Sequence, residues 1–151
     1  MLVTSGKHKG KPLEVVALKD PCFIQGVLLS EAESKAQKAM QAEARRLVDV
    51  FDRMPFVVRC CGHGCERRAM RCSIYKSDVL NPWWWCDACD PRQYGAGECK
   101  VHIVRTYHDA LDFSAQFDDP SVAMDLVRAM AEAKGAPSSP SRRQADVFFN
   151  A

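Results

Sequence analysis

The feature that most constrains this chain is the spacing of its cysteines. Eight cysteines occur in 151 residues, and two close pairs, Cys61-x3-Cys65 and Cys86-x2-Cys89, stand on either side of a twenty-residue insert. Each pair is a short turn that can present two thiolates to one metal ion. Four thiolates on two such turns form the tetrahedral site of a zinc ribbon. We therefore expect one structural Zn²⁺ per chain, with Cys61, Cys65, Cys86 and Cys89 as its ligands.

The first ligand position has two candidates. Cys60 and Cys61 are adjacent, and neighbouring side chains of an extended chain point to opposite faces, so only one of the two is expected to reach the metal. The tighter spacing to Cys65 favours Cys61, with Cys60 as the alternative. His63 lies between the ligands, but the second cysteine pair leaves no position for it.

The other cysteines are expected to pack rather than bind metal. Cys22 and Cys72 resemble small buried hydrophobes. Cys99-x2-His102 has ligand spacing, but it begins a predicted strand in which the two side chains would not share a face. A site closed by four thiolates stabilises structure and leaves no open coordination position for chemistry. Because the sequence also has no paired-carboxylate motif and no nucleophile elbow, we expect no catalytic residues and a protein that is not an enzyme.

The pattern of apolar residues and helix-capping signals predicts an α+β fold. Ser30 to Glu33 fits a capping box and Pro55 stops the helix that follows. This helix carries an apolar seam at heptad-like spacing, which indicates either packing against the chain's own modules or a homodimer through the long helix. The expected segments are a small α/β module (1–29), the long helix (30–54), a β-rich zinc ribbon (55–108), an acidic segment with a helix (109–135) and a disordered tail (136–151).

Local signals refine these segments. In the first module, Gly6 and Gly10 bracket a turn between extended pieces, and Asp20-Pro21 opens a short helix. The ribbon has β-like runs at 56–59, 70–75, 83–85 and 101–107, with a turn at Asn81-Pro82. Asp119-Pro120 opens the later helix, which Gly135 ends.

The charge distribution limits the binding partners. The formal net charge is only +2, which argues against a protein that coats nucleic acid by bulk electrostatics. Residues 59–108 hold eight basic and five acidic residues, whereas residues 109–151 hold four basic and seven acidic ones. The sequence has no apolar run of about 20 residues and no stretch that resembles a signal peptide, so we expect a cytoplasmic protein with no membrane partner.

Within the basic segments, several side chains are candidates for nucleic-acid contacts. Flexible amides and ammonium groups around the first glycines can hold phosphate, and arginines follow the first cysteine pair. A tryptophan in the run 83–85 is a candidate for stacking on a base. The predicted nucleic-acid-binding residues are Lys7, Lys9, Lys11, Arg67, Arg68, Arg71 and Trp84.

The N-terminal stretch also resembles a known family. Gly6-Lys7-His8-Lys9-Gly10-Lys11-Pro12-Leu13-Glu14-Val15, followed by Asp20-Pro21-Cys22-Phe23-Ile24, is similar to the small C-terminal domain of exodeoxyribonuclease X-like proteins and its stand-alone bacterial and phage relatives. The similarity covers residues 4–29. It implies a nucleic-acid-associated accessory domain and carries no nuclease residues, because the active site of that family lies in a separate domain. The ribbon resembles zinc ribbons of nucleic-acid-processing proteins in spacing only.

Two functions follow from these observations. The leading hypothesis is a non-catalytic accessory protein that binds nucleic acid or a nucleic-acid-bound protein complex. The alternative is a phage- or prophage-type adaptor or inhibitor that acts on a host complex through its long helix and ribbon, a reading that the acidic C-terminal segment favours.

Overall fold

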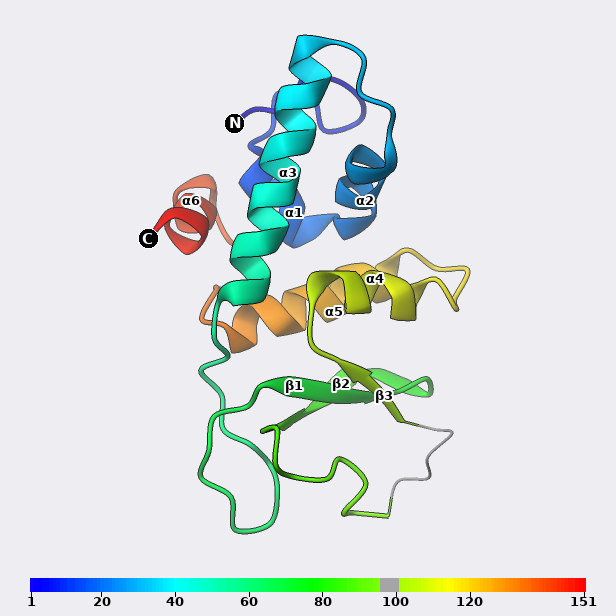
Figure 1. Cartoon of the computed structure of the whole chain (residues 1–151), viewed down its shortest axis with the longest axis vertical. Coiled ribbons are helices and arrows are strands. Elements are labelled where there is room, and N and C mark those ends of the chain that lie inside the picture. Colours follow the sequence, from blue (N-terminus) through cyan, green and yellow to red (C-terminus); the bar gives the residue numbers. More distant parts are fainter. Residues whose placement is uncertain (96–100) are drawn as a thin grey trace.

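The structure is a computed structural model that describes residues 1–95 and 101–151. These residues form six helices and a three-stranded antiparallel sheet, which confirms the predicted α+β class. Figure 1 shows α1, α2, α3 and α6 at one end, the sheet at the other, and α4 and α5 between them. The elements are α1 (Leu13–Lys19), α2 (Pro21–Leu29), α3 (Lys35–Arg53), β1 (Arg71–Tyr75), β2 (Asp78–Trp85), β3 (Val101–Val104), α4 (Tyr107–Ser114), α5 (Ser121–Ala133) and α6 (Arg142–Asn150).

The N-terminal module is more helical than the sequence indicated. The turn around the first glycines is present, with Gly6 and Gly10 both at a φ of 82°. Residues 13–19, for which the sequence indicated only a short apolar segment, form the helix α1. Asp20 caps α2 as predicted, because its carboxylate accepts a hydrogen bond from the Phe23 N–H at 3.1 Å.

The long helix begins later than its first capping signal. Ser34 is its N-cap: the Ser34 hydroxyl accepts a hydrogen bond from the Gln37 N–H, and the Gln37 side chain accepts one from the Ser34 N–H. Ser30 instead ends α2, where its hydroxyl donates to the Val27 carbonyl at 2.8 Å. The expected start at residue 30 was therefore wrong because Ser34-x2-Gln37 forms the capping box in its place.

The apolar seam of α3 lies inside the chain's own core. Met40, Ala44, Leu47 and Phe51 are all buried, and they belong to the main hydrophobic cluster. A homodimer through this helix would therefore have to use its other faces.

The sheet has the strand order β2-β1-β3. Tyr75 pairs with Asp78, so the hairpin turn lies at residues 76 and 77 rather than at the predicted Asn81-Pro82. Pro82 lies inside β2, an edge strand, where the missing N–H is tolerated. The run 56–59 forms no strand and contributes only an isolated bridge between Arg59 and Arg68.

The two faces of the sheet have different neighbours. Cys72, Ile74 and Val104 are buried in the main cluster, on the side where α4 contacts β3 and α5 contacts β2. In Figure 1 the helices lie on this side, and the loop that follows β2 lies on the other, which we call the outer face. Helices therefore support one face and leave the other to the cysteine-bearing loops.

The C-terminal residues are ordered rather than disordered. Gly135, at a φ of 98°, follows the end of α5 as predicted. The chain then forms α6, which begins with a capping box between Ser141 and Gln144. Phe149 of this helix is 3% exposed, and α6 contacts α1 and α3. Apolar burial against these helices outweighs the Pro/Ser-rich composition that suggested disorder.

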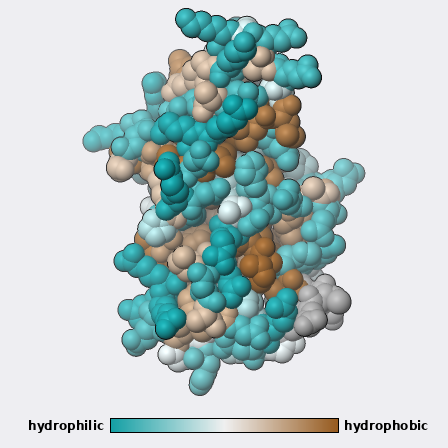
Figure 2. Space-filling view, in the orientation of Figure 1, coloured by the Kyte–Doolittle hydropathy of each residue, from teal (hydrophilic) through white to brown (hydrophobic). Residues whose placement is uncertain are grey.

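The main hydrophobic cluster extends from Val3 to Phe149 and includes the inner face of the sheet. Hydrophilic residues cover most of the face seen in Figure 2, where apolar residues form small separate areas. Among residues 1–95 and 101–151, no helix combines the length and apolar character that crossing a membrane requires.

Candidate metal centre

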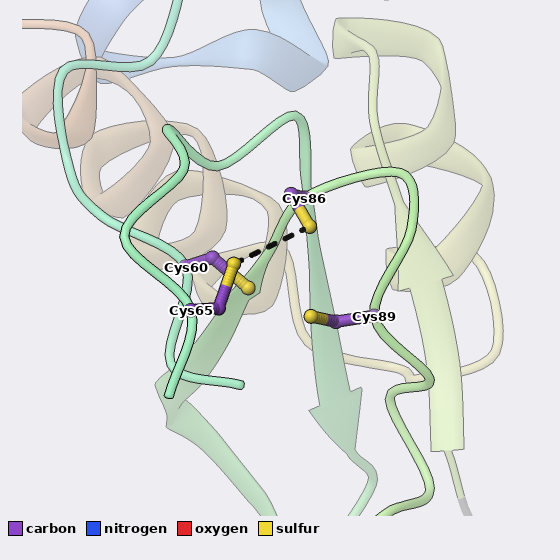
Figure 3. Close-up of side chains that lie close together, drawn as sticks. All are labelled: Cys60, Cys65, Cys86 and Cys89. Carbon is purple, nitrogen blue, oxygen red and sulfur yellow. Dashed lines mark hydrogen bonds between the residues drawn. The ribbon is translucent and has the colours of Figure 1, made fainter. Parts of the chain in front are cut away.

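Four cysteines from two separate loops meet at one end of the sheet. Cys60 and Cys65 lie on the loop before β1, Cys86 directly follows β2, and Cys89 lies three residues later. Their sulfur atoms are all within 4.8 Å of one another, and Figure 3 shows the side chains converging on a common centre. The cluster could hold a metal ion.

The sulfur spacing suits a tetrahedral metal ion. The Cys65 and Cys86 Sγ atoms are 3.8 Å apart, and none of the four cysteines is in a disulfide. Zinc–sulfur bonds of about 2.3 Å in a regular tetrahedron place the sulfurs about 3.8 Å apart. The four residues therefore fit a tetrahedral thiolate site, of the kind that holds zinc or an iron–sulfur centre.

The cluster contains Cys60 in place of the favoured Cys61. The Cys60 N–H donates to the Arg67 carbonyl at 2.8 Å, and the Cys61 N–H donates to the Trp84 carbonyl at 2.8 Å. These bonds hold the two residues in extended chain, so their side chains point in different directions. The choice of Cys61 was therefore wrong, and the Cys60-x4-Cys65 alternative is the observed one.

The backbone between the first two ligands closes around the sulfurs. The Gly62 N–H donates to Cys60 Sγ at 3.3 Å, and the Cys65 N–H donates to the Gly62 carbonyl at 3.0 Å. Gly64 has a φ of 67°, a left-handed conformation that favours glycine. The two glycines thus let the loop turn beneath the ligands.

In the second cysteine pair, the surroundings of Cys86 favour its thiolate form. Burial disfavours the charged form of Cys86, but hydrogen bonds from the Ala88 and Cys89 N–H groups outweigh it and lower the pKa of Cys86 to about 6. Hydrogen bonding with Cys86 and Cys60 raises the pKa of Cys89 to about 12. The Cys86 and Cys89 thiols therefore do not both ionise near neutral pH unless a cation replaces their protons.

Arginine side chains brace the loop that carries the second pair. Arg71 Nη2 donates to the Cys89 carbonyl at 3.0 Å, and Arg71 Nε donates to the Cys86 carbonyl at 3.4 Å. Arg105 forms an ion pair with Asp87 at 2.8 Å. Such contacts orient the ligands of a metal. Arg71, expected to contact phosphate, is thus committed to the metal centre.

Among the described residues, the other cysteines and the histidines are not members of the cluster. Cys72 is fully buried, which raises its pKa to about 12, and Cys22 is half-buried. His63 is exposed, and its backbone N–H donates to the Gln93 side chain at 2.9 Å. His102 packs against Phe113, with ring centroids 5.0 Å apart. Cys99 lies outside the described residues.

The N-terminal lysines surround a turn that is partly closed by its own ion pairs. Lys7 Nζ lies 2.6 Å from Asp20 Oδ2, and the His8 Nε2–H donates to the same oxygen at 2.7 Å. Burial would raise the pKa of Asp20, but these two hydrogen bonds outweigh it and lower that pKa. Lys9 and Lys11 are exposed. Lys11 Nζ also donates to His8 Nδ1 at 3.4 Å, so Lys7 and Lys11 contact the turn itself and Lys9 is presented outward.

Arginines gather beside the first cysteine pair. Arg67 and Arg68 are both exposed, as is Arg59, which faces Arg68 across the isolated bridge. Among the described residues, none of these three guanidinium groups takes part in an ion pair. Arg67 and Arg68 were predicted as nucleic-acid contacts, whereas Arg59 was not.

The three tryptophans have three different surroundings. Trp85 is 1% exposed, and its indole N–H donates to the Ser73 hydroxyl at 2.7 Å. Trp84 lies on the inner face, where it packs against Phe56 with ring centroids 5.1 Å apart. Trp83 is 44% exposed on the outer face. The ring presented to solvent is therefore Trp83, in place of the expected Trp84.

Sequence reasoning also missed Tyr94. It is 54% exposed, and its ring lies 5.8 Å from that of Trp83 and 5.9 Å from that of Trp85. The strand alternation that places Trp83 and Trp85 on one face is readable from the sequence. The return of Tyr94 onto that face depends on the path of the second loop, for which the sequence carries no signal.

No family model, no curated protein and no solved structure matches this chain.

Proposed function

We propose that this protein is a non-catalytic accessory factor that binds nucleic acid through a ribbon held together by one Zn²⁺. Cys60, Cys65, Cys86 and Cys89 would hold the ion. Their soft thiolates and compact spacing support zinc, and four ligands leave no coordination position for a substrate. Among the residues that the structure describes, the apolar cluster at this end consists of Cys60, Trp85 and Cys86 with half-buried neighbours. The metal would therefore supply much of the ribbon's folding free energy.

One observation supports nucleic-acid binding in particular: Arg59 and Arg68 face each other across the isolated bridge. Flanking bonds from Ala69 N–H to Val58 O and from Cys60 N–H to Arg67 O make this a non-hydrogen-bonded antiparallel pair. In such a pair the side chains lie on one face, with Cβ atoms about 4.5–5.5 Å apart, and like charges destabilise the pairing. A bound phosphate group would relieve this repulsion, and nucleic acid presents phosphates in a regular array.

Salt-dependent binding tests this proposal. The purified, metal-containing protein would be titrated into fluorescent 20-nucleotide DNA and RNA at several salt concentrations, with affinity read by anisotropy. We expect affinity to fall steeply as salt rises. The double variant Arg59→Ala/Arg68→Ala should bind more weakly and show a shallower salt slope, whereas Arg142→Ala/Arg143→Ala, an exposed pair on α6, should match the native protein. The proposal would be contradicted by the absence of binding, or by an affinity that does not change with salt concentration.

The alternative adaptor function makes a different prediction. Leu29 at the end of α2 is 78% exposed, and the C-terminal segment is acidic, features that suit a protein partner better than a phosphate backbone. A protein partner that is recovered by the native chain after nuclease treatment, together with no measurable affinity for the oligonucleotides, would favour the adaptor.

A further inference from the structure

Three aromatic rings on the outer face form a continuous surface, which we call the aromatic shelf: Trp83, Trp85 and Tyr94. The indole rings of Trp83 and Trp85 are nearly parallel, with an interplanar angle of 15° and centroids 6.4 Å apart. Tyr94 packs against both. Trp85 is the buried base of the shelf, and Trp83 and Tyr94 are its exposed rings.

The shelf is held in place from several sides. The hydrogen bond from the Trp85 indole to Ser73 fixes the central ring to β1. The Tyr94 hydroxyl donates to the Cys61 carbonyl at 2.7 Å, which ties the second loop to the first. Because these rings are already ordered, a ligand that stacks on them would immobilise few side-chain rotations on binding.

The charges near the shelf favour a polyanion as its occupant. Lys76 lies in the turn at one end of the β1–β2 hairpin, and Arg59 and Arg68 lie near its other end, where β1 begins; all three are exposed. A five-residue strand such as β1 spans roughly 17 Å, so cations lie at both ends of the hairpin that carries Trp83 and Trp85. The acidic side chains nearby are partly engaged, since Asp87 pairs with Arg105 and Asp78 accepts a hydrogen bond from Asn81.

We infer that the aromatic shelf binds the unpaired bases of single-stranded nucleic acid, with a base stacking on Trp83 and a neighbouring base reaching Tyr94. In a duplex the bases stack on one another and their faces are closed to a protein ring, whereas in a single strand every base offers one. The inference rests on the proposed function. It adds that the ligand is single-stranded and that Trp83 and Tyr94 distinguish a single strand from a duplex.

The test compares shelf variants on single strands and on duplex. The purified, metal-containing protein, Trp83→Ala and Trp83→Phe would be titrated into labelled dT12, U12 and a 12-base-pair duplex. Leu80→Ala serves as the matched control, because Leu80 is a 64% exposed apolar residue on the same strand outside the shelf. Far-ultraviolet circular dichroism and metal content would establish that each variant is folded.

A stacked base contributes about 1–3 kcal/mol, so Trp83→Ala should weaken binding of at least one of the single strands roughly 5- to 150-fold. Trp83→Phe should recover most of that affinity, and Leu80→Ala should bind like the native protein. The native protein should bind the duplex more weakly than the single strand, and Trp83→Ala should leave duplex binding unchanged. Quenching of tryptophan emission by the bound strand should diminish in Trp83→Phe although binding persists.

Three results would overturn the inference. If Trp83→Ala binds single strands as tightly as the native protein, the shelf does not contact bases, while nucleic-acid binding through the arginines stands. The same conclusion follows if Trp83→Ala weakens duplex and single strand equally. If the native protein binds none of the three probes, the proposed function fails and the inference fails with it.

Discussion

Gly62 lies directly against the sulfur of Cys89: a Cβ built on Gly62 would be 2.6 Å from Cys89 Sγ, closer than a real Cβ can approach, and 3.3 Å from Cys60 Sγ. The loop that supplies the first two cysteines therefore passes so near the ligands that only a residue without a side chain fits. This contact ties the two cysteine pairs together in space, although they come from different parts of the chain.

Replacing this glycine should weaken metal binding. In Gly62→Ala the new methyl group must displace Cys89 Sγ or the loop, so we expect at least a tenfold loss of Zn²⁺ affinity, measured by competition with a chromophoric chelator. Gly26→Ala is the control, because Gly26 lies in α2 with open space around the position of a Cβ. Equal affinities of Gly62→Ala and the native protein would contradict the observed packing.

Tyr107 links the beginning of α4 to α1. Its hydroxyl donates to the Ala17 carbonyl at 2.7 Å, and the side chain is fully buried. Tyr107→Phe leaves that buried carbonyl without this donor, so the free energy of unfolding in urea should fall by roughly 1–3 kcal/mol. Tyr75→Phe, at a half-buried position in β1, should change it little. A neutral Tyr107→Phe would show that the hydroxyl contributes nothing there.

Because Lys134 is buried, we expect the free energy of unfolding to depend on pH. Lys134 donates to the Met54 carbonyl at 2.6 Å and lies over the Phe56 ring, 4.3 Å from its centroid. Burial lowers the pKa of Lys134 to about 8, against 10.5 for a free lysine, although nearby Asp52 opposes the shift. Between these pH values the unfolded chain binds the proton and the folded chain has lost it, so raising the pH favours the folded state.

The comparison of native protein with Lys134→Met isolates this effect from thiol ionisation. The difference in unfolding free energy, native minus variant, should rise between pH 8 and 10, by at most about 1.4 kcal/mol per pH unit. Urea denaturation at several pH values gives the difference. A value that stays flat or falls over this range would show that the pKa of Lys134 is not lowered.

The ordered C-terminus predicts a large cost for removing Phe149. This side chain is 3% exposed in α6, and truncating a buried phenylalanine typically costs 3–5 kcal/mol. Phe149→Ala should lower the unfolding free energy by about that amount, and Val147→Ala, 55% exposed on the same helix, by no more than about 0.5 kcal/mol. Rapid proteolysis of residues 136–151 in the folded native protein would instead indicate the disorder expected from composition.

Short-range signals in the sequence predicted the metal cluster well but not all its members. Two close cysteine pairs suffice to predict two loops that meet, because each spacing limits the turn that joins its ligands. Whether Cys60 or Cys61 joins the cluster depends on the direction in which each side chain leaves the extended backbone. The bridge between Arg59 and Arg68 sets that direction. Sequence spacing alone does not contain this long-range pairing.

For the fold, too, features set by neighbouring residues could be predicted from the sequence, and features set by distant contacts could not. Asp20 and Gly135 act locally and were placed correctly, whereas α6 was missed because its stability depends on burying Phe149 near helices distant in the sequence. Competing local signals also made the start of the long helix ambiguous, because Ser30 and Ser34 both precede plausible capping partners. In the structure Ser30 is hydrogen-bonded to carbonyls at the end of α2, which leaves Ser34 to cap α3. Tertiary contacts decided the case of α6, whereas local hydrogen bonds decided between Ser30 and Ser34.

The metal content of the native protein, Cys60→Ser and Cys61→Ser shows whether the cluster holds zinc and whether Cys60 is one of its ligands. Native mass spectrometry with elemental analysis of protein purified without added metal should find one Zn²⁺ per native chain and one per Cys61→Ser chain. Cys60→Ser should lose the ion or hold it at least tenfold more weakly against a chelator. A metal-free native protein, or a Cys61→Ser variant that loses zinc while Cys60→Ser retains it, would contradict the account.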